Sequence, residues 1–171
     1  MVLCIVLAVF AVVLDQITKL LVVQRIAENA SAEGIRGVFR LTYVKNSGAA
    51  FGMFANHRWV FLIFSVVAIV AILLYVWKTK PKSLWVRLGL GMILGGGIGN
   101  MIDRVRFGYV VDFIDLSFMR FAIFNVADSF VTVGCVLLFV WLIASTIQER
   151  RALKVPAPAE HSSPAEDDHD V

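Results

Sequence analysis

The chain has 171 residues, of which 59% are hydrophobic and only 17% are charged. A soluble domain of this size is nearer half apolar and a quarter charged, so an ordinary soluble protein, a disordered chain and a disulfide-rich secreted scaffold are all excluded. The net charge of +3 hides an asymmetry, because six of the 13 acidic residues lie between Glu149 and Asp170. The first 148 residues are therefore nearly free of acids, and we expect an integral membrane protein.

Four apolar segments are long enough to cross a bilayer as helices. At a rise of about 1.5 Å per residue, about twenty residues span the hydrocarbon core, where the backbone must satisfy its own hydrogen bonds. The predicted spans are Val2–Val23, Trp59–Trp77, Leu84–Ile102 and Ala127–Ile147. The third span contains six glycines, which indicates close packing between helices.

The distribution of basic residues predicts how the chain is oriented. The short loop between the second and third spans contains three lysines at 78, 80 and 82 and no acid. By the positive-inside rule this loop faces the cytoplasm, which places both termini there as well. We expect residues 1–147 to form one membrane domain. The change to Pro, Ser, Glu and Asp from Gln148 onward predicts a disordered cytoplasmic tail over residues 148–171.

The outer segments between the spans have the pattern of β-strands. Residues 37–45 alternate, with Phe39, Leu41 and Tyr43 on one face, and residues 109–115 and 119–124 are rich in β-branched and aromatic side chains. We expect β segments at about 36–47 and 107–124, which form a small sheet on the outer surface.

Polar residues that lipid does not tolerate unpaired gather at the outer ends of the spans and in the outer segments. They are Asp15, Lys19, Asn46, Asn100, Asp103, Arg104, Asp112, Asn125 and Asp128. Four spans of alternating direction bring all of them to the same side of the membrane. Charged groups at such depth are costly and are functional candidates by default.

Most of these residues also have a purely structural explanation. Asp15 and Lys19 would form an i,i+4 ion pair, and Asp103 and Arg104 an interfacial charge couple. Asn46 to Gly48 would form a turn, and Asp128 would cap the last helix. Asp112 has no such explanation, because it lies between two pairs of apolar residues.

The available side chains limit the chemistry to carboxylates. The only histidine before the tail is His57, and no nucleophile–histidine pair, metal motif or phosphate-binding loop is present. Two aspartates held close together share a proton, so that one acts as a base and the other as an acid, as in aspartic proteases. The same residues would suit a small proton-coupled transporter, and spacing alone does not decide between the two. A transporter needs an ionisable path to both faces, whereas the cytoplasmic halves of the spans lack acids.

Five sequence blocks together resemble the ordered signature of the lipoprotein signal peptidase family, also called signal peptidase II. The blocks are DQITK at 15–19, NSGAAF at 46–51, GNMIDR at 99–104, VDF at 111–113 and FNVAD at 124–128. The resemblance extends from residue 15 to about residue 134, and the five blocks in this order are highly specific.

The resemblance implies an aspartic endopeptidase of the bacterial inner membrane. Such enzymes cleave the signal peptide from diacylglyceryl-modified prolipoproteins, on the N-terminal side of the lipidated cysteine. It further implies an all-α bundle of four transmembrane helices with a small extracytoplasmic β-cradle, and an active site near the outer leaflet.

The family's residue roles are transferred by matching these blocks. The catalytic pair corresponds to Asp112 and Asp128. The residues that support the site, or bind substrate or the cyclic peptide inhibitor globomycin, correspond to Asp15, Lys19, Asn46, Gly48, Asn100, Asp103, Arg104 and Asn125. We expect a monomer in contact with membrane lipid, with no metal, cofactor or nucleic-acid partner.

Overall fold

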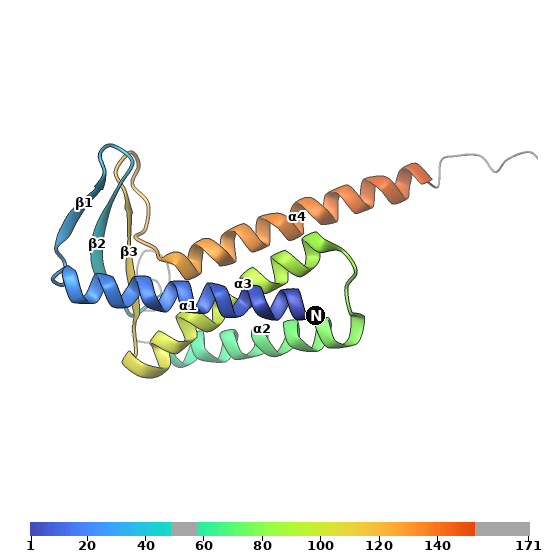
Figure 1. The fold of residues 1–171 in the computed structure, drawn as a ribbon, viewed down its shortest axis with the longest axis horizontal. Coiled ribbons are helices and arrows are strands. Elements are labelled where there is room, and N and C mark those ends of the chain that lie inside the picture. Colours follow the sequence, from blue (N-terminus) through green and yellow to red (C-terminus); the bar gives the residue numbers. More distant parts are fainter. Residues whose placement is uncertain (49–57, 153–171) are drawn as a thin grey trace, which may run out of the picture.

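The computed structural model describes residues 1–48 and 58–152 (Figure 1). The helices are α1 (Val2–Arg25), α2 (Arg58–Thr79), α3 (Leu84–Phe107) and α4 (Val126–Ala152), and the strands are β1 (Ser31–Ile35), β2 (Phe39–Asn46) and β3 (Val110–Leu116). The sheet lies at the end of the helices remote from the N-terminus (Figure 1). Residues 49–51 of the NSGAAF block and the tail after residue 152 lie outside the described residues.

All four predicted spans are helices that are long and apolar enough to cross a membrane. The α3 helix continues past the predicted end at Ile102, and Gly108 terminates it with a left-handed φ of 83°. The α2 helix ends at Thr79, and the next residue, Lys80, leaves the helical conformation with a positive φ of 44° directly before Pro81. The α4 helix reaches Ala152, so the prediction of disorder from residue 148 is wrong for residues 148–152, where the helix simply continues.

Glycines allow α3 to pack closely against two neighbours. Gly91 and Gly95 face α1, and a Cβ at Gly95 would lie 2.6 Å from the Ala8 carbonyl oxygen. On another side of α3, a Cβ at Gly89 would lie 2.7 Å from Leu138 of α4. The predicted role of these glycines in helix packing is therefore confirmed.

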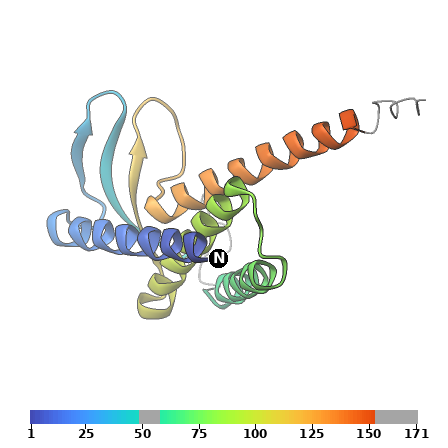
Figure 2. The ribbon, with the colours of Figure 1, turned by 45° about the vertical axis from the view of Figure 1, so that its right-hand side comes forward.

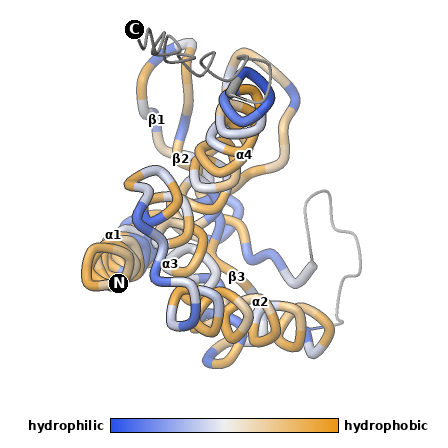
Figure 3. Tube along the Cα trace, turned by 90° about the vertical axis from the view of Figure 1, so that its right-hand side faces the viewer, coloured by the Kyte–Doolittle hydropathy of each residue, from blue (hydrophilic) through white to orange (hydrophobic). Residues whose placement is uncertain are grey.

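The outer helices expose apolar side chains over most of their length. Phe64 on α2 is 70% exposed and Phe139 on α4 is 64% exposed. Figure 3 shows these two helices as largely hydrophobic tubes. Because water would not tolerate so much exposed apolar surface, these faces are the lipid-contacting surface of a multi-pass membrane protein.

The three strands form an antiparallel sheet in the order β1-β2-β3. The predictions at 37–45 and 109–115 are confirmed as β2 and β3. Strand β1 was not predicted, because all five of its residues are exposed and show no apolar alternation. Tyr43 and Phe113 pack with Val22 of α1, which fixes the sheet on the end of that helix.

The predicted strand at 119–124 is not formed as a strand. Within this segment only Phe124 makes a β-bridge, to Ile114. The N–H groups of Phe113 and Ile114 both donate to the Phe124 carbonyl, so the chain crosses the edge of β3 and does not run along it. The aromatic composition of this segment thus misled the sequence prediction.

Candidate active site

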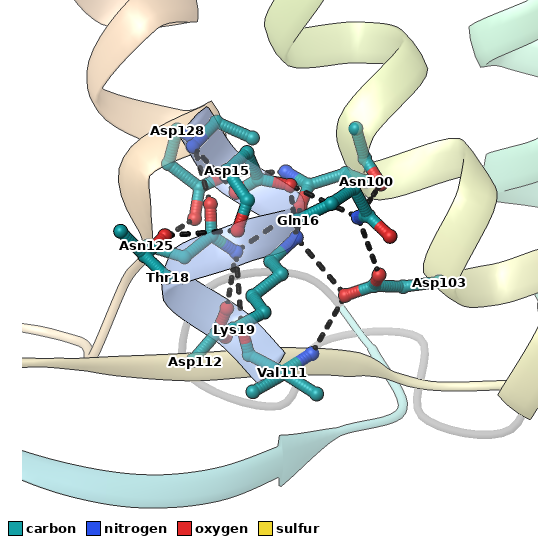
Figure 4. A network of polar contacts seen from close by, with 12 residues as sticks. Asp15, Gln16, Thr18, Lys19, Asn100, Asp103, Val111, Asp112, Asn125 and Asp128 are labelled. Carbon is teal, nitrogen blue, oxygen red and sulfur yellow. Dashed lines mark hydrogen bonds and ion pairs between the residues drawn. The ribbon is translucent and has the colours of Figure 1, made fainter. Parts of the chain in front are cut away.

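Five polar side chains are almost completely buried where α1, α3, β3 and the start of α4 meet. They are Asp15, Lys19, Asp103, Asp112 and Asn125, each at most 3% exposed. Figure 4 shows how they point toward one another from these four elements. Buried charged groups require partners, and each of these residues has several.

Lys19 joins α1 to α3. Its Nζ lies 2.8 Å from Asp15 Oδ2 and 2.9 Å from Asp103 Oδ2, and it donates to Asn100 Oδ1 at 2.9 Å. The i,i+4 pair considered from the sequence is therefore present, but it is not self-contained. One cation pairs with two carboxylates on different helices.

Each of these two carboxylates also holds a backbone amide. Asp15 Oδ1 accepts from the Ala127 N–H at 3.0 Å, and Asp103 Oδ2 accepts from the Val111 N–H at 3.1 Å. Both amides directly precede an aspartate in the chain. The ion cluster around Lys19 therefore fixes the backbone next to two further carboxylates.

Asp112 is the first of the two carboxylates that follow a backbone amide held by the Lys19 cluster. Its Oδ1 accepts from Asn125 Nδ2 at 2.6 Å and its Oδ2 from Asn46 Nδ2 at 2.8 Å. Burial, with a smaller contribution from the nearby charge of Asp128, raises the pKa of Asp112 to about 7 against the lowering effect of the two asparagines. This carboxyl group therefore exchanges its proton near neutral pH.

Asp128 is the second carboxylate that follows a backbone amide held by the Lys19 cluster. Its Oδ1 accepts from Asn100 Nδ2 at 2.7 Å. Its Oδ2 accepts from the Asn125 N–H at 3.1 Å, and Asn125 Oδ1 accepts from the Asp128 N–H at 2.9 Å. This reciprocal arrangement is a capping box, so the helix-cap explanation is correct. The cap also makes Asn125 a direct partner of both aspartates.

A turn after β2 completes the network. The Gly48 N–H donates to Asn46 Oδ1 at 2.9 Å, which confirms the predicted turn. Arg104 donates to the Gly48 carbonyl at 3.3 Å, and its guanidinium lies 4.9 Å from the centre of the Phe61 ring. The alternative of an Asp103–Arg104 couple is wrong, because Asp103 is paired with Lys19 and Arg104 faces the turn.

The two aspartates open into one cavity of about 660 Å³. Asp112 and Asp128 lie in its wall together with Arg104, while Phe61 and Val133 extend it between α2 and α4. This volume is in the range of ligand sites. The cavity therefore joins ionisable groups at one end to an apolar region between helices.

All ten residues singled out in the sequence belong to one connected network, and one member of it was missed. Gln16 donates to Asp103 Oδ1 at 3.0 Å and to the Gly99 carbonyl at 3.3 Å. A neutral glutamine on a helix surface gives no sign of a functional role in the sequence. Only the position of Gln16 between Asp15 and Lys19 could have indicated that it belongs to the site. Within residues 1–48 and 58–152, no cluster of three His, Cys, Asp or Glu side chains could hold a metal ion.

Four helices that are long and apolar enough to cross a membrane, with two aspartates that open into a cavity at one end of them, define a multi-pass membrane protein. The model of the family described as signal peptidase (SPase) II matches residues 7–144. The chain belongs to this family of membrane proteases.

Curated relatives and solved structures agree with this assignment. The lipoprotein signal peptidase of Streptococcus thermophilus strain CNRZ 1066 is 52% identical over 75% of this chain and 84% of its own length. That of Symbiobacterium thermophilum is 49% identical over 82% and 94%. A bacterial membrane enzyme solved in meso at 2.3 Å resolution superposes with a TM-score of 0.81 at 31% identity, over 92% of this chain and 94% of the other. The fold predicted from the sequence, a membrane helix bundle with a small sheet, is confirmed.

Proposed function

We propose that this protease is an aspartic endopeptidase in which Asp112 and Asp128 are the catalytic pair. The observation that supports this most directly is that both carboxylates open into the same cavity while one residue, Asn125, contacts both. Burial favours the proton on Asp112. Two N–H donors and the N-terminus of α4 stabilise a negative charge on Asp128.

In this mechanism the ionised Asp128 accepts a proton from water, and the water oxygen bonds to the scissile carbonyl carbon. Asp112 donates its proton to the carbonyl oxygen. When the C–N bond then breaks, the leaving nitrogen takes the proton held by Asp128, and Asp112 recovers a proton from the tetrahedral hydroxyl group. Both carboxyl groups return to their initial states.

We assign the remaining site residues to support and substrate binding. Asn100 and Asn125 hold the two carboxylates, and the Lys19 cluster with Asp15 and Asp103 holds the backbone beside them. Asn46, Gly48 and Arg104 form the wall next to Asp112, where substrate or a cyclic peptide such as globomycin would bind.

The substrate we propose is a prolipoprotein with a diacylglyceryl-modified cysteine, cleaved on the N-terminal side of that cysteine. A lipid-anchored cysteine keeps the scissile bond at the membrane surface, which suits a site at the end of the helices. The basic residues at 78–82 are at the opposite end of α2 and α3, which supports cytoplasmic termini and a site near the outer leaflet of the inner membrane. We expect the enzyme to act as a monomer.

A transporter is disfavoured by the placement of the buried charges. In the part of the chain that the structure describes, the almost completely buried charged residues are Asp15, Lys19, Asp103 and Asp112. All belong to the one network beside the sheet, so the described residues form no buried ionisable path to the other end.

The test is cleavage by the purified protein in lipid nanodiscs. A prolipoprotein with the diacylglyceryl group and the same precursor without it are incubated in parallel, and products are identified by mass spectrometry. We expect a cut directly before the modified cysteine and little product from the unmodified precursor. A cut elsewhere, or equal cleavage of both precursors, would contradict the proposed specificity.

A further inference from the structure

Arg87, in the first turn of α3, has a buried nitrogen atom without a partner. Its Nε is buried and has no hydrogen-bond partner among the described residues, although the side chain as a whole is partly exposed. The guanidinium group only donates hydrogen bonds and keeps its charge at all physiological pH values. Because a buried donor without an acceptor is costly, an acceptor from outside the protein would stabilise this arrangement.

The packing of α3 against α1 places Arg87 at the end of the bundle that is remote from the sheet. Gly91 and Gly95 lie against the backbone of Cys4 and Ala8, respectively, so the two helices run parallel and in step. Arg87 is one turn before Gly91 and is therefore level with the first residue of the chain. The loop between α2 and α3 is at this same end of the bundle (Figures 1 and 2).

The positive charge at this end has no counter-charge in the described protein. The basic cluster consists of Lys78, Lys80, Lys82 and Arg87, and its three lysines are exposed. Within residues 1–48 and 58–152, none of the four forms an ion pair with an acid. The first turns of α1 and α3 also contain no acidic residue, so the positive ends of their dipoles add to the same potential. The cluster therefore attracts an anion.

Two tryptophans indicate the depth of the basic cluster in the membrane. Trp77 is 63% exposed near the end of α2, and Trp85 is 55% exposed at the start of α3. Exposed tryptophans at the ends of membrane helices lie at the level of the lipid headgroups. Leu74 and Leu84 are also exposed beside them and continue the lipid-contacting surface. The anions available at this depth are the phosphates of lipids, which favours a lipid over an acidic protein as the ligand.

We propose that the basic cluster is a binding site for an anionic phospholipid, with Arg87 as the main donor to its phosphate. The planar guanidinium matches phosphate oxygens, basic pockets between membrane helices suit anionic headgroups, and the acyl chains would lie along the exposed apolar faces of α2 and α3. This site is separate from the aspartates, which are at the opposite end of α3. The inference goes beyond the proposed peptidase function and does not depend on it.

The experiment measures lipid binding to the full-length protein in detergent by native mass spectrometry. The protein is titrated with phosphatidylglycerol, which is anionic, and with phosphatidylcholine, which has no net charge. We expect the wild type to prefer phosphatidylglycerol, and Arg87→Gln to weaken its binding by about tenfold or more. Arg87→Lys keeps the charge without the planar donors and should fall between the two. Lys82→Gln, at an exposed position, should weaken binding by about fivefold, and it tests the inference if the Arg87 variants fold poorly.

The matched control is Arg106→Gln, which removes the same charge from an exposed arginine in the last turn of α3 and should leave phosphatidylglycerol binding unchanged. Equal binding of the two lipids by the wild type would overturn the inference, and it is the result expected if acidic residues at 160–170 neutralise the basic cluster. Unchanged binding in both Arg87→Gln and Lys82→Gln would overturn it as well. Displacement of phosphatidylglycerol by excess inorganic phosphate would contradict a lipid as the ligand and indicate free phosphate.

Discussion

The side-chain nitrogen of Asn125 lies 2.6 Å from Oδ1 of Asp112. The same asparagine donates its backbone N–H to Asp128 and accepts from the N–H of that residue. One residue therefore caps α4 and sets the two carboxylates relative to each other. Helix capping and active-site geometry depend on the same side chain, and substitution can separate the two roles.

Asn125→Ser is expected to retain the cap and lose the contact with Asp112. A serine hydroxyl can accept from the Asp128 N–H, whereas alanine cannot, and loss of a cap costs about 1 kcal/mol. We predict that both Asn125→Ser and Asn125→Ala lower kcat/KM by about tenfold or more. Thermal unfolding should show the alanine variant to be the less stable of the two. Near wild-type activity of Asn125→Ser would mean that the Asp112 contact is unimportant.

Asn46→Ala is expected to shift the pH profile upward. The hydrogen bond from Asn46 stabilises the ionised form of Asp112 and lowers its pKa, which is about 7. Without this bond the pKa rises, so the proton that the mechanism needs on Asp112 is retained to higher pH. The alkaline limb of kcat/KM, normalised to the maximum of each variant, should move to higher pH. A shift to lower pH would contradict the role of Asp112 as the protonated partner.

Lys19→Met is expected to destabilise the fold severely. It removes the cation shared by Asp15 and Asp103 and leaves both buried carboxylates without a compensating positive charge. Breaking such a buried cluster costs about 3–5 kcal/mol, and thermal unfolding in detergent should show it. Adding Asp15→Asn and Asp103→Asn should restore part of the loss, because the cluster is then neutral. If the single variant unfolds at the wild-type temperature, the Lys19 cluster does not stabilise the folded state.

Gly96→Ala and Gly97→Ala form a matched pair on adjacent residues of α3. The methyl group at position 96 would press on the Ala127 backbone, and the one at position 97 meets no atom of the described residues within 4 Å. Overpacking of this kind costs about 1–3 kcal/mol. We predict that Gly96→Ala lowers the unfolding temperature and Gly97→Ala does not. Equal losses would show that both glycines serve packing.

The sequence predicted the helices and most of the site for identifiable reasons. Membrane spans produce long apolar segments, and Asp112 is conspicuous because an acid stands among apolar neighbours. The order of the motif blocks then indicated ten residues of the network but not Gln16. Asp112 and Asp128 are 16 positions apart, and it is the packing of β3 beside the start of α4 that brings them together.

Other features needed the three-dimensional arrangement. The partner of Asp103 is Lys19 and not the adjacent Arg104, because helix α1 lies against that face of α3. Strand β1 has no apolar alternation, since both of its faces are exposed. Gly97 looks like its neighbours in the sequence, and only the lack of any described atom within 4 Å of its Cβ position distinguishes it from a packing residue.

The catalytic assignment is tested most directly by removing each exchangeable proton without changing shape. Asp112→Asn and Asp128→Asn are close to isosteric. The matched control is Asp115→Asn on the same strand, because Asp115 faces Arg40 and lies outside the cavity lining. All variants are quantified in the membrane and assayed on the lipidated precursor.

We predict that Asp112→Asn and Asp128→Asn accumulate normally, bind the precursor and fail to cleave it. The double variant should be little worse than either single one, because residues that act as a unit are not additive. Asp115→Asn should cleave at close to the wild-type rate, and Asp103→Asn should retain measurable turnover. Near wild-type cleavage by Asp112→Asn together with an inactive Asp103→Asn would contradict this account and would make Asp103 the partner of Asp128.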